Sequence, residues 1–352
     1  MLRDWESGDE ATYNLWHSMR ERALEWQQET YKRLWVNIDK TYYESDIYKY
    51  GKELAQKFLE KWIFEKDKKW NIVNNTWKDT SKFLILRHDW TSVYATQDLA
   101  LAKIRYDERK MEEMIYVVWS EQEFYFKQIF STLDDIWFDF VRWCYHLSYW
   151  YISIPEWKMK SREWTVVDAD NLMDEIHEKA RELLISRSNN ESNQNIATKA
   201  ERIAIGAITF HFLKYTSTKD IVFDKNSSIS FEWQTGPYVQ YTFARCKSLL
   251  EKVVALPKRQ DKIAIDIDVK DLVLHMYNVP NIYQEALEQK DISIVVNYLY
   301  VLAQYFNARY HSTKILVDDN ATKNNNLILV ITVSNIMQQC MDIIWIPRII
   351  KM

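Results

Sequence analysis

The stretch FLILRHDWTSVYATQD, residues 83–98, decides the fold of the N-terminal half of the chain. Its first four residues form an apolar run of strand length, and the pattern from Leu99 to Arg109 predicts a helix after it. The β-rich run from Met114 to Val118 and the helical pattern from Glu121 to Phe130 repeat this order. Strands that alternate with helices predict an α/β fold with a parallel sheet, in which ligands bind beyond the carboxyl ends of the strands.

Amphipathic helices are predicted on both sides of this region. The first runs from Tyr13 to Leu34, and we expect Trp16 to be buried on its apolar face. From about Thr235 onward the pattern is helical throughout. The apolar positions that predict the last two helices are Val295, Leu299, Leu302 and Phe306, then Leu329, Val333, Ile336, Cys340 and Ile343. Polar loops are predicted at 186–192 and 318–326, and Pro347 ends the last helix.

Length and composition bound the class of protein. A chain of 352 residues is long enough for two or three domains. The net charge of -4 excludes a global basic field, so a nucleic-acid surface would have to be local. The cysteines Cys144, Cys246 and Cys340 are too far apart for a disulfide framework or a CxxC zinc site. The polar start MLRDWESGDE and the short apolar run 327–333 predict a soluble, cytoplasmic protein without a signal peptide.

Polar side chains follow both predicted strands. Tyr94 and Asp98 are four residues apart at a strand-to-helix junction, where Asp98 could pair with a cationic ligand. The alternative is that Asp98 is a helix N-cap. Gln122 follows the second strand and could hydrogen-bond a ligand, or it could be an ordinary surface residue.

Two further segments carry cations or aromatic rings. Lys158, Lys160 and Arg162 surround Ser161 in a predicted loop, which suits phosphate oxygens but equally describes a solvated basic loop. In TGPYVQYTFAR, residues 235–245, a Gly-Pro turn leads into a helix. Tyr238, Tyr241 and Arg245 of this helix could stack bases and hold phosphates, or they could be core rings beside a surface Arg.

The sequence contains no other motif for a nucleotide site or a metal site. The seven His show no paired-ligand spacing, so no metal site is predicted. There is no Walker A motif, and four Gly in the whole chain leave no glycine-rich phosphate loop.

The order and spacing of these motifs resemble the C-terminal two thirds of bacterial arginyl-tRNA synthetase, a class I aminoacyl-tRNA synthetase. Residues 83–98 resemble its R-x-D-G-T-x-x-Y-x-T-x-D motif, and residues 115–128 resemble Y-V-V-G-x-x-Q-x-x-H-F-x-Q. Residues 147–173 resemble the segment with K-M-K-S-R, a variant of the KMSKS loop. The remaining matches are YKRLWVNIDKTYYES (31–45), FEWQTGPYVQYTFAR (231–245) and the anticodon-domain segment 286–311.

The resemblance implies a fold and a set of roles. It implies the rest of a Rossmann-type α/β catalytic domain at residues 1–230 and an all-α anticodon-binding domain at 235–352. Tyr94, Asp98 and Gln122 would line the arginine pocket, with Asp98 on the guanidinium. The 158–162 loop, through Lys158, Lys160 and Arg162, would stabilise the ATP phosphates, with Mg²⁺ accompanying the ATP. The residues implied to bind tRNA are Tyr238, Tyr241, Arg245, Tyr298 and Met352. The resemblance implies a monomer whose partners are tRNA, arginine and ATP.

The HIGH motif of the family is absent from this sequence. We therefore expect the chain to be an N-terminally truncated part of the catalytic domain that forms no arginyl-adenylate by itself. The alternative function is a non-catalytic tRNA-binding fragment. A different class I synthetase is disfavoured by Tyr94 and Asp98 together with the TGPY turn.

The chain also has 4 Gly and 16 Trp, where about 25 Gly would be ordinary. Eleven of these Trp stand where the family has Gly: Trp35, Trp62, Trp70, Trp90, Trp119, Trp137, Trp150, Trp157, Trp164, Trp233 and Trp345. Independent mutation would not select the bulkiest side chain each time. We infer that UGA codons, which encode Gly in some bacterial lineages, have been read as Trp. Several of these residues should then be exposed, at turns or helix ends, with positive φ.

Overall fold

The computed structural model describes residues 1–351, except 76–81, 137, 151, 154–167, 188–191, 225, 231–233, 254–256 and 258–268. The chain forms two compact units, Met1–Tyr149 and Trp150–Met352. The sequence predicts a domain boundary near residue 230, whereas the two compact units divide between Tyr149 and Trp150. The boundary near residue 230 therefore stays a prediction. Within the described residues, no helix is both long and apolar enough to cross a membrane.

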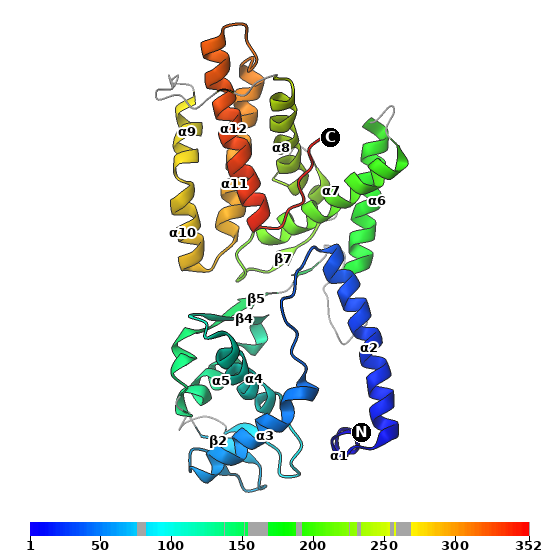
Figure 1. Cartoon of the computed structure of the whole chain (residues 1–352), viewed down its shortest axis with the longest axis vertical. Coiled ribbons are helices and arrows are strands. Elements are labelled where there is room, and N and C mark those ends of the chain that lie inside the picture. Colours follow the sequence, from blue (N-terminus) through cyan, green and yellow to red (C-terminus); the bar gives the residue numbers. More distant parts are fainter. Residues whose placement is uncertain are drawn as a thin grey trace. The chain divides into compact units, whose positions relative to one another are not determined.

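The first unit combines helices with short strands (Figure 1). Its helices are α1 (Leu2–Ser7), α2 (Glu10–Arg33), α3 (Glu44–Glu60), α4 (Tyr94–Arg109) and α5 (Glu123–Asp135), with 3-10 turns η1 (Ser120–Gln122) and η2 (Asp139–Trp143). Its strands are β1 (Glu65–Lys66), β2 (Ile72–Asn74), β3 (Phe83–Leu86), β4 (Met114–Trp119) and β5 (Cys144–Tyr149). The predicted strands and helices of this region are therefore confirmed, with α4 beginning five residues earlier than the apolar pattern indicated.

The single parallel sheet is only partly confirmed. β4 and β5 are parallel, with Met114 opposite Cys144, and α5 forms the crossover between them. β3 instead pairs antiparallel with β2, in the three-stranded sheet β1-β2-β3. The connection from β2 to β3 is too short for a parallel crossover, which needs a dozen or more residues. In the described part of the chain, β3 and β4 thus belong to different sheets.

Burial along α3 and α4 places the core of this unit. Leu54 and Phe58 of α3 pack with Leu99 of α4 and with Ile85 and Leu86 of β3, all of which are buried. The spacing of Leu54 and Phe58 puts both on one helical face. This core supports the strand end and helix start from which Tyr94 and Asp98 project.

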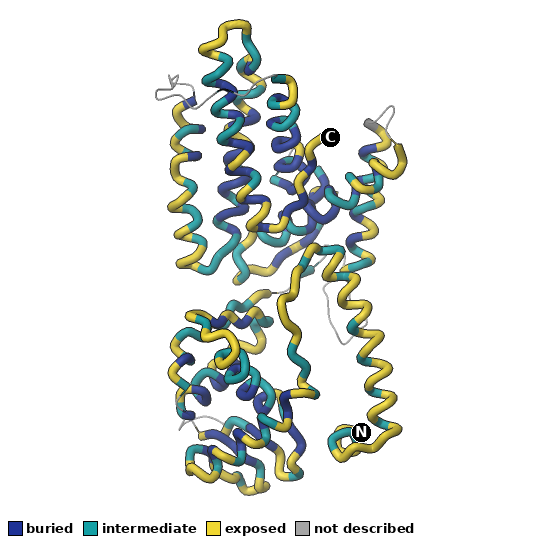
Figure 2. Tube along the Cα trace, viewed as in Figure 1, coloured by how far each residue is buried: buried dark blue, intermediate teal, exposed yellow. Residues whose placement is uncertain are grey.

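The helix predicted near the N-terminus is present as α2, but none of its residues is buried. Trp16 is half-buried rather than buried, and Met19 and Trp26 are exposed. Within its own unit the main helical neighbour of α2 is the six-residue α1, which is too short to cover an apolar stripe of that length. Figure 2 shows this contrast between α2 and the buried faces of the later helices.

The second unit is mainly helical. Its helices are α6 (Ala169–Arg187), α7 (Asn193–Leu213), α8 (Gly236–Glu251), α9 (Lys270–Tyr277), α10 (Val279–Gln289), α11 (Ser293–Ser312) and α12 (Asn320–Ile343), with the 3-10 turn η4 (Ser227–Ile229). The strands β6 (Ile152–Ser153) and β7 (Ile221–Val222) pair in parallel. The predicted apolar positions of α11, Val295, Leu299, Leu302 and Phe306, are all buried in one core with α8 and α12.

The loop predicted at 318–326 is wrong, because α12 begins at Asn320. The carboxylate of Asp319 accepts a hydrogen bond from the Thr322 backbone N–H at 2.8 Å, so this polar run is a capped helix start. Asn326 is buried, and its amide donates to the Ile315 carbonyl at 3.0 Å. On the predicted α12 face, Val333, Ile336 and Cys340 are buried, whereas Ile343 at the end of the helix is exposed.

Glycine is required where α7 meets α8. A Cβ added at Gly236 would lie 2.0 Å from the carbonyl oxygen of Gly206, which is far below contact distance. Beside this contact the buried Gln240 amide donates to the carbonyl of Arg202 at 2.8 Å and to that of Pro347 at 2.7 Å. These bonds join α7, α8 and the C-terminal segment at one point.

Gly236→Ala should lower the free energy of unfolding by about 1–3 kcal/mol or more, because backbone rather than a flexible side chain must move. Urea unfolding followed by circular dichroism measures this. Thr198→Ala, at an exposed position of α7, is the control and should stay within about 0.5 kcal/mol of the starting protein. If both variants changed the free energy of unfolding equally, α7 and α8 could move apart without a loss of stability.

Candidate functional site

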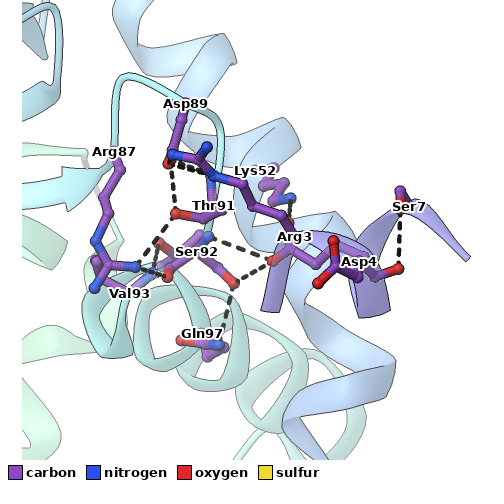
Figure 3. A network of polar contacts seen from close by, with 12 residues as sticks. Arg3, Asp4, Ser7, Lys52, Arg87, Asp89, Thr91, Ser92, Val93 and Gln97 are labelled. Atoms are coloured by element: carbon purple, nitrogen blue, oxygen red, sulfur yellow. Dashed lines mark hydrogen bonds and ion pairs between the residues drawn. The ribbon is translucent and has the colours of Figure 1, made fainter. Parts of the chain in front are cut away.

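The turn between β3 and α4 is held by a network of polar contacts (Figure 3). Asp89 accepts hydrogen bonds from the Thr91 backbone N–H at 3.1 Å and from its hydroxyl at 2.7 Å. The Arg87 guanidinium donates to the Ser92 carbonyl at 3.1 Å and to the Thr91 hydroxyl at 3.3 Å. The bonds from Thr91, with a smaller contribution from the Arg3 guanidinium, hold the pKa of Asp89 well below its ordinary value. Asp89 is therefore ionised at any working pH.

Helix α1 contacts the same turn. The carboxylate of Glu6 accepts a hydrogen bond from the Ser92 hydroxyl at 3.0 Å and forms an ion pair with Lys52 at 2.6 Å. Arg3 pairs with Asp89. These contacts connect α1, α3 and the start of α4 around one turn.

Thr96 fixes the start of α4 on the buried strand. Its hydroxyl accepts a hydrogen bond from the Val93 backbone N–H at 3.0 Å and donates to the carbonyl of Ile85. Thr96 is fully buried. The first turn of α4, which carries Tyr94 and leads to Asp98, thus has a defined position over β3.

Asp98 is not a helix N-cap. Val93 is the N-cap of α4, and Asp98 lies more than one turn inside the helix. Its side chain is half-buried, and its carboxylate accepts a hydrogen bond from the Tyr125 hydroxyl of α5. Burial raises the pKa of Asp98, the bond from Tyr125 opposes that rise, and the nearby charge of Glu44 adds to it. Asp98 is therefore a carboxylate whose charge the surrounding protein does not fully compensate.

The other two predicted residues of this site are accessible. Tyr94 is 73% exposed and lies one turn before Asp98, so the two side chains share a helix face. Gln122 is also exposed. It ends η1 and lies three residues before Tyr125, so α5 brings it to the helix face that reaches Asp98. The alternative of an ordinary surface Gln remains open.

Glu44 and Tyr125 were not predicted. Glu44 is the first residue of α3, and its charge raises the pKa values of both Asp98 and Tyr125. The carboxylates of Glu44 and Asp98, on separate helices, are thus near enough for their charges to repel each other. The available sequence signal was the pair Glu44-Ser45 that ends the segment 31–45.

A cavity of about 380 Å³ lies beside this site. Rings of Trp5, Trp16 and Tyr48 line it, together with the carboxylates of Glu6 and Glu44. Neither Asp98 nor the predicted Tyr94 and Gln122 are among its lining residues. The candidate arginine-binding side chains are therefore not part of this cavity.

A second cluster lies on α8 and α11 of the other unit. The Arg245 guanidinium lies 4.7 Å from the ring centre of Tyr241 and 4.3 Å from that of Tyr310. Arg245 also donates to the side-chain oxygen of Asn307, whose amide donates to Thr242 at 2.7 Å. The hydrogen bond to Asn307 orients the Arg245 cation, and the neighbouring ring of Tyr241 is exposed.

The remaining tyrosines predicted to bind tRNA are less accessible. Tyr238 is half-buried, with its ring 5.6 Å from that of Tyr300. Tyr298 is only 4% exposed, stacks on His275 at 4.2 Å, and donates its hydroxyl to the His275 carbonyl at 3.0 Å. Tyr298 is therefore a ring of the core, while the roles of Tyr238 and Tyr241 stay predictions.

Several predicted site residues lie outside the described residues: Lys158, Lys160, Arg162 and Met352. Their roles stay predictions. Among the described residues, no group of three or more His, Cys, Asp or Glu side chains could hold a metal ion.

Seven of the eleven Trp at expected Gly positions are described, and five of them have positive φ: Trp35, Trp62, Trp70, Trp90 and Trp345. Their φ values lie between 55° and 65°, and all five side chains are exposed, Trp62 by 93%. Trp119, with φ of -58°, and Trp150 do not have positive φ. The four described Trp outside the set also lack positive φ: Trp5, Trp16, Trp26 and Trp143.

Two sequence families match the chain. Residues 1–225 match the family described as tRNA synthetases class I (R), catalytic domain, and residues 239–352 match the DALR anticodon binding domain. Curated relatives include the arginine–tRNA ligases of Parabacteroides distasonis, 38% identical over 357 residues, and Borrelia turicatae, 36% identical over 366 residues. These alignments cover 98% and 100% of this chain but 60% and 62% of the relatives. The chain thus spans about three fifths of their length.

Solved structures share the fold. The arginyl-tRNA synthetase of Thermus thermophilus superposes with a TM-score of 0.84 at 22% identity, over 99% of this chain and 68% of that one. The enzyme of Plasmodium falciparum gives a TM-score of 0.84 at 20% identity, over 99% of this chain and 60% of that one.

Asp98→Asn should raise the free energy of unfolding at pH 7. A folded-state pKa above the unfolded value means that the folded protein binds the proton more tightly, so charging Asp98 destabilises the fold as pH rises. The gain should vanish as the pH falls below 3.8, where Asp98 is protonated in both the folded and the unfolded state. Urea unfolding at several pH values measures it.

Asp319→Asn is the control, because Asp319 caps α12 and has a lowered pKa. It should give no gain at pH 7. If Asp98→Asn changed the free energy of unfolding by the same amount at every pH, that result would contradict the raised pKa of Asp98.

Proposed function

Because the chain belongs to the class I tRNA synthetase (R) family, with a DALR anticodon-binding domain after the catalytic domain, we propose that it serves the ATP-dependent ligation of arginine to its tRNA through arginyl-adenylate. The observation that carries the proposal is the partly compensated carboxylate of Asp98, beside Glu44, on a surface of α4 and α5. We assign the protein to the cytoplasm, as a monomer, on the basis of the family.

Arginine recognition rests on the charge and shape of the guanidinium. A carboxylate can accept two parallel N–H bonds from its planar fork, which a lysine ammonium cannot supply. Asp98 would take this group, and the charge of Glu44 would add attraction for the cation. Tyr94 and Gln122, both accessible and each one turn from the Asp98–Tyr125 pair, would hold the rest of the amino acid.

The activation step would use the loop at residues 158–162. Lys158, Lys160 and Arg162 would stabilise the charge that develops on the ATP phosphates, which requires no protein nucleophile. Mg²⁺ would arrive with the ATP, and we assign it no protein ligand.

The helical domain would bind tRNA through Tyr241 and Arg245. Arg245 would present its charge to phosphate, and the exposed ring of Tyr241 would stack on a base. Tyr238 lies one turn earlier in the same helix. Tyr298 is buried, so we assign it no stacking role.

We further propose that the organism makes Gly at the eleven Trp positions. Support comes from the backbone: φ near 60° costs an L side chain roughly 1–2 kcal/mol, and Gly nothing. Five of the seven described positions adopt this conformation, whereas the four described Trp outside the set do not. A Trp ring that is exposed to solvent at such a turn also buries little apolar surface, so the fold gains little from it.

The functional proposal is tested by two binding measurements on the chain. Asp98→Asn should weaken arginine binding in a calorimetric titration by roughly thirty-fold or more, since truncating one partner of a buried charge pair costs about 2–5 kcal/mol. Its affinity for the arginine-accepting tRNA should not change.

Tyr241→Ala is the matched variant with the opposite expectation. Losing one stacked base at about 1–3 kcal/mol should reduce tRNA affinity roughly ten-fold in fluorescence anisotropy, with arginine binding intact. Tight tRNA binding without any arginine binding would favour the alternative, a non-catalytic tRNA-binding protein.

Peptide mass spectrometry of the protein from its native cells tests the glycine proposal. Peptides that contain positions 62, 70 and 90 should carry Gly masses. The peptide with Trp16, which is outside the set, is the internal control and should carry a Trp mass. Trp masses at most of the eleven positions would overturn the proposal.

A further inference from the structure

We propose that Tyr125 is the positioning residue for arginine recognition: its hydroxyl holds the Asp98 carboxylate in the orientation that receives the guanidinium. This inference rests on the proposed function. It assigns a role to a residue of α5 that lies in the motif at 115–128 but was not among the predicted site residues.

The contact joins two helices through one hydrogen bond. The Tyr125 hydroxyl donates to Oδ2 of Asp98, twenty-seven residues earlier in the chain. Among the described residues, no hydrogen bond is made to Oδ1, so that oxygen stays available to a ligand. A carboxylate with one oxygen fixed has lost rotation about its side chain and presents the other oxygen in a defined direction.

Tyr125 is itself held by packing. Its ring meets Phe83 of β3 edge-on, with 5.7 Å between ring centres, and meets Phe126 edge-on at 5.5 Å. Edge-to-face contacts of this kind fix the plane of a ring as well as its position. The hydroxyl is therefore carried on a ring that two neighbours orient, and it cannot follow Asp98 if the carboxylate rotates away.

The proton of Tyr125 is permanent. Burial, and then the charge of Asp98, raise the pKa of Tyr125 above its ordinary value, so the hydroxyl stays protonated at any working pH. The bond thus always runs from Tyr125 to Asp98. It also lowers the pKa of Asp98, against burial and the charge of Glu44, which both raise it. The hydrogen bond from Tyr125 therefore favours the charged form of Asp98 as well as orienting its carboxylate.

Tyr125→Phe is the decisive variant, because it removes the hydroxyl and leaves the ring contacts with Phe83 and Phe126 in place. Tyr116→Phe is the matched control. Tyr116 is buried in the same aromatic cluster, 5.3 Å from Phe126, but its hydroxyl donates to the Met114 sulfur at 2.9 Å. Both variants lose one buried hydroxyl, and only the first loses the bond to Asp98.

The first measurement does not need arginine. The Asp98 carboxyl carbon is titrated by NMR in protein labelled with ¹³C-aspartate, and its signal is assigned with Asp98→Asn. In Tyr125→Phe the titration midpoint of Asp98 should move to higher pH, whereas in Tyr116→Phe it should stay where it is. An unchanged midpoint in Tyr125→Phe would overturn the inference.

The second measurement is the arginine affinity of the same proteins by calorimetry. Tyr125→Phe should bind arginine about ten-fold more weakly, as expected for losing a hydrogen bond to a charged group, and Tyr116→Phe should bind normally. Normal binding by Tyr125→Phe would overturn the inference and leave the proposed function standing. No binding by the unmodified chain, with the midpoint shift still present, would instead contradict the proposed function and, with it, the role in recognition.

Discussion

The buried hydroxyl of Thr96 determines where the site can be. It accepts the Val93 N–H and donates to the Ile85 carbonyl, so one side chain caps the first turn of α4 and attaches it to the strand below. Asp89 stabilises the preceding turn in the same way, by accepting two hydrogen bonds from Thr91. With both ends of the turn fixed, the Asp98 side chain faces α5, where it accepts a hydrogen bond from Tyr125.

This placement opposes stability and, under the proposed function, would serve binding. A carboxylate taken from water without a cation loses solvation that a single hydroxyl does not replace, and the raised pKa of Asp98 records that loss. A guanidinium arriving at Asp98 would supply the missing partner. Arg245 in the second unit shows the opposite arrangement, because its charge already lies between two rings and is hydrogen-bonded to Asn307. Such a cation is preorganised for a polyanion and needs no rearrangement to meet one.

Local patterns predicted local structure well and spatial relations poorly. The runs at Phe83–Leu86 and Met114–Trp119 are strands because apolar, β-rich residues in short runs have few alternatives. The strand that pairs with Phe83–Leu86 was not predictable, because β2 is only three residues long and gives no periodic signal. The start of α12 was missed because a capping Asp319 resembles a loop residue in sequence. In the site, motif spacing indicated Asp98, but the contacts of Tyr125 and Glu44 depend on how α3, α4 and α5 pack. The positive φ values at Trp positions followed directly from where Gly was expected.

We propose that the charge of Asp98 selects a guanidinium. The most direct test is a calorimetric titration of the chain with arginine and with citrulline. Citrulline has nearly the same shape but a neutral urea group. The account predicts that arginine binds and that citrulline binds at least roughly thirty-fold more weakly, as expected when a buried charge loses its partner. Equal affinities for the two would show that the carboxylates of Asp98 and Glu44 do not recognise the ligand by charge and would contradict the account.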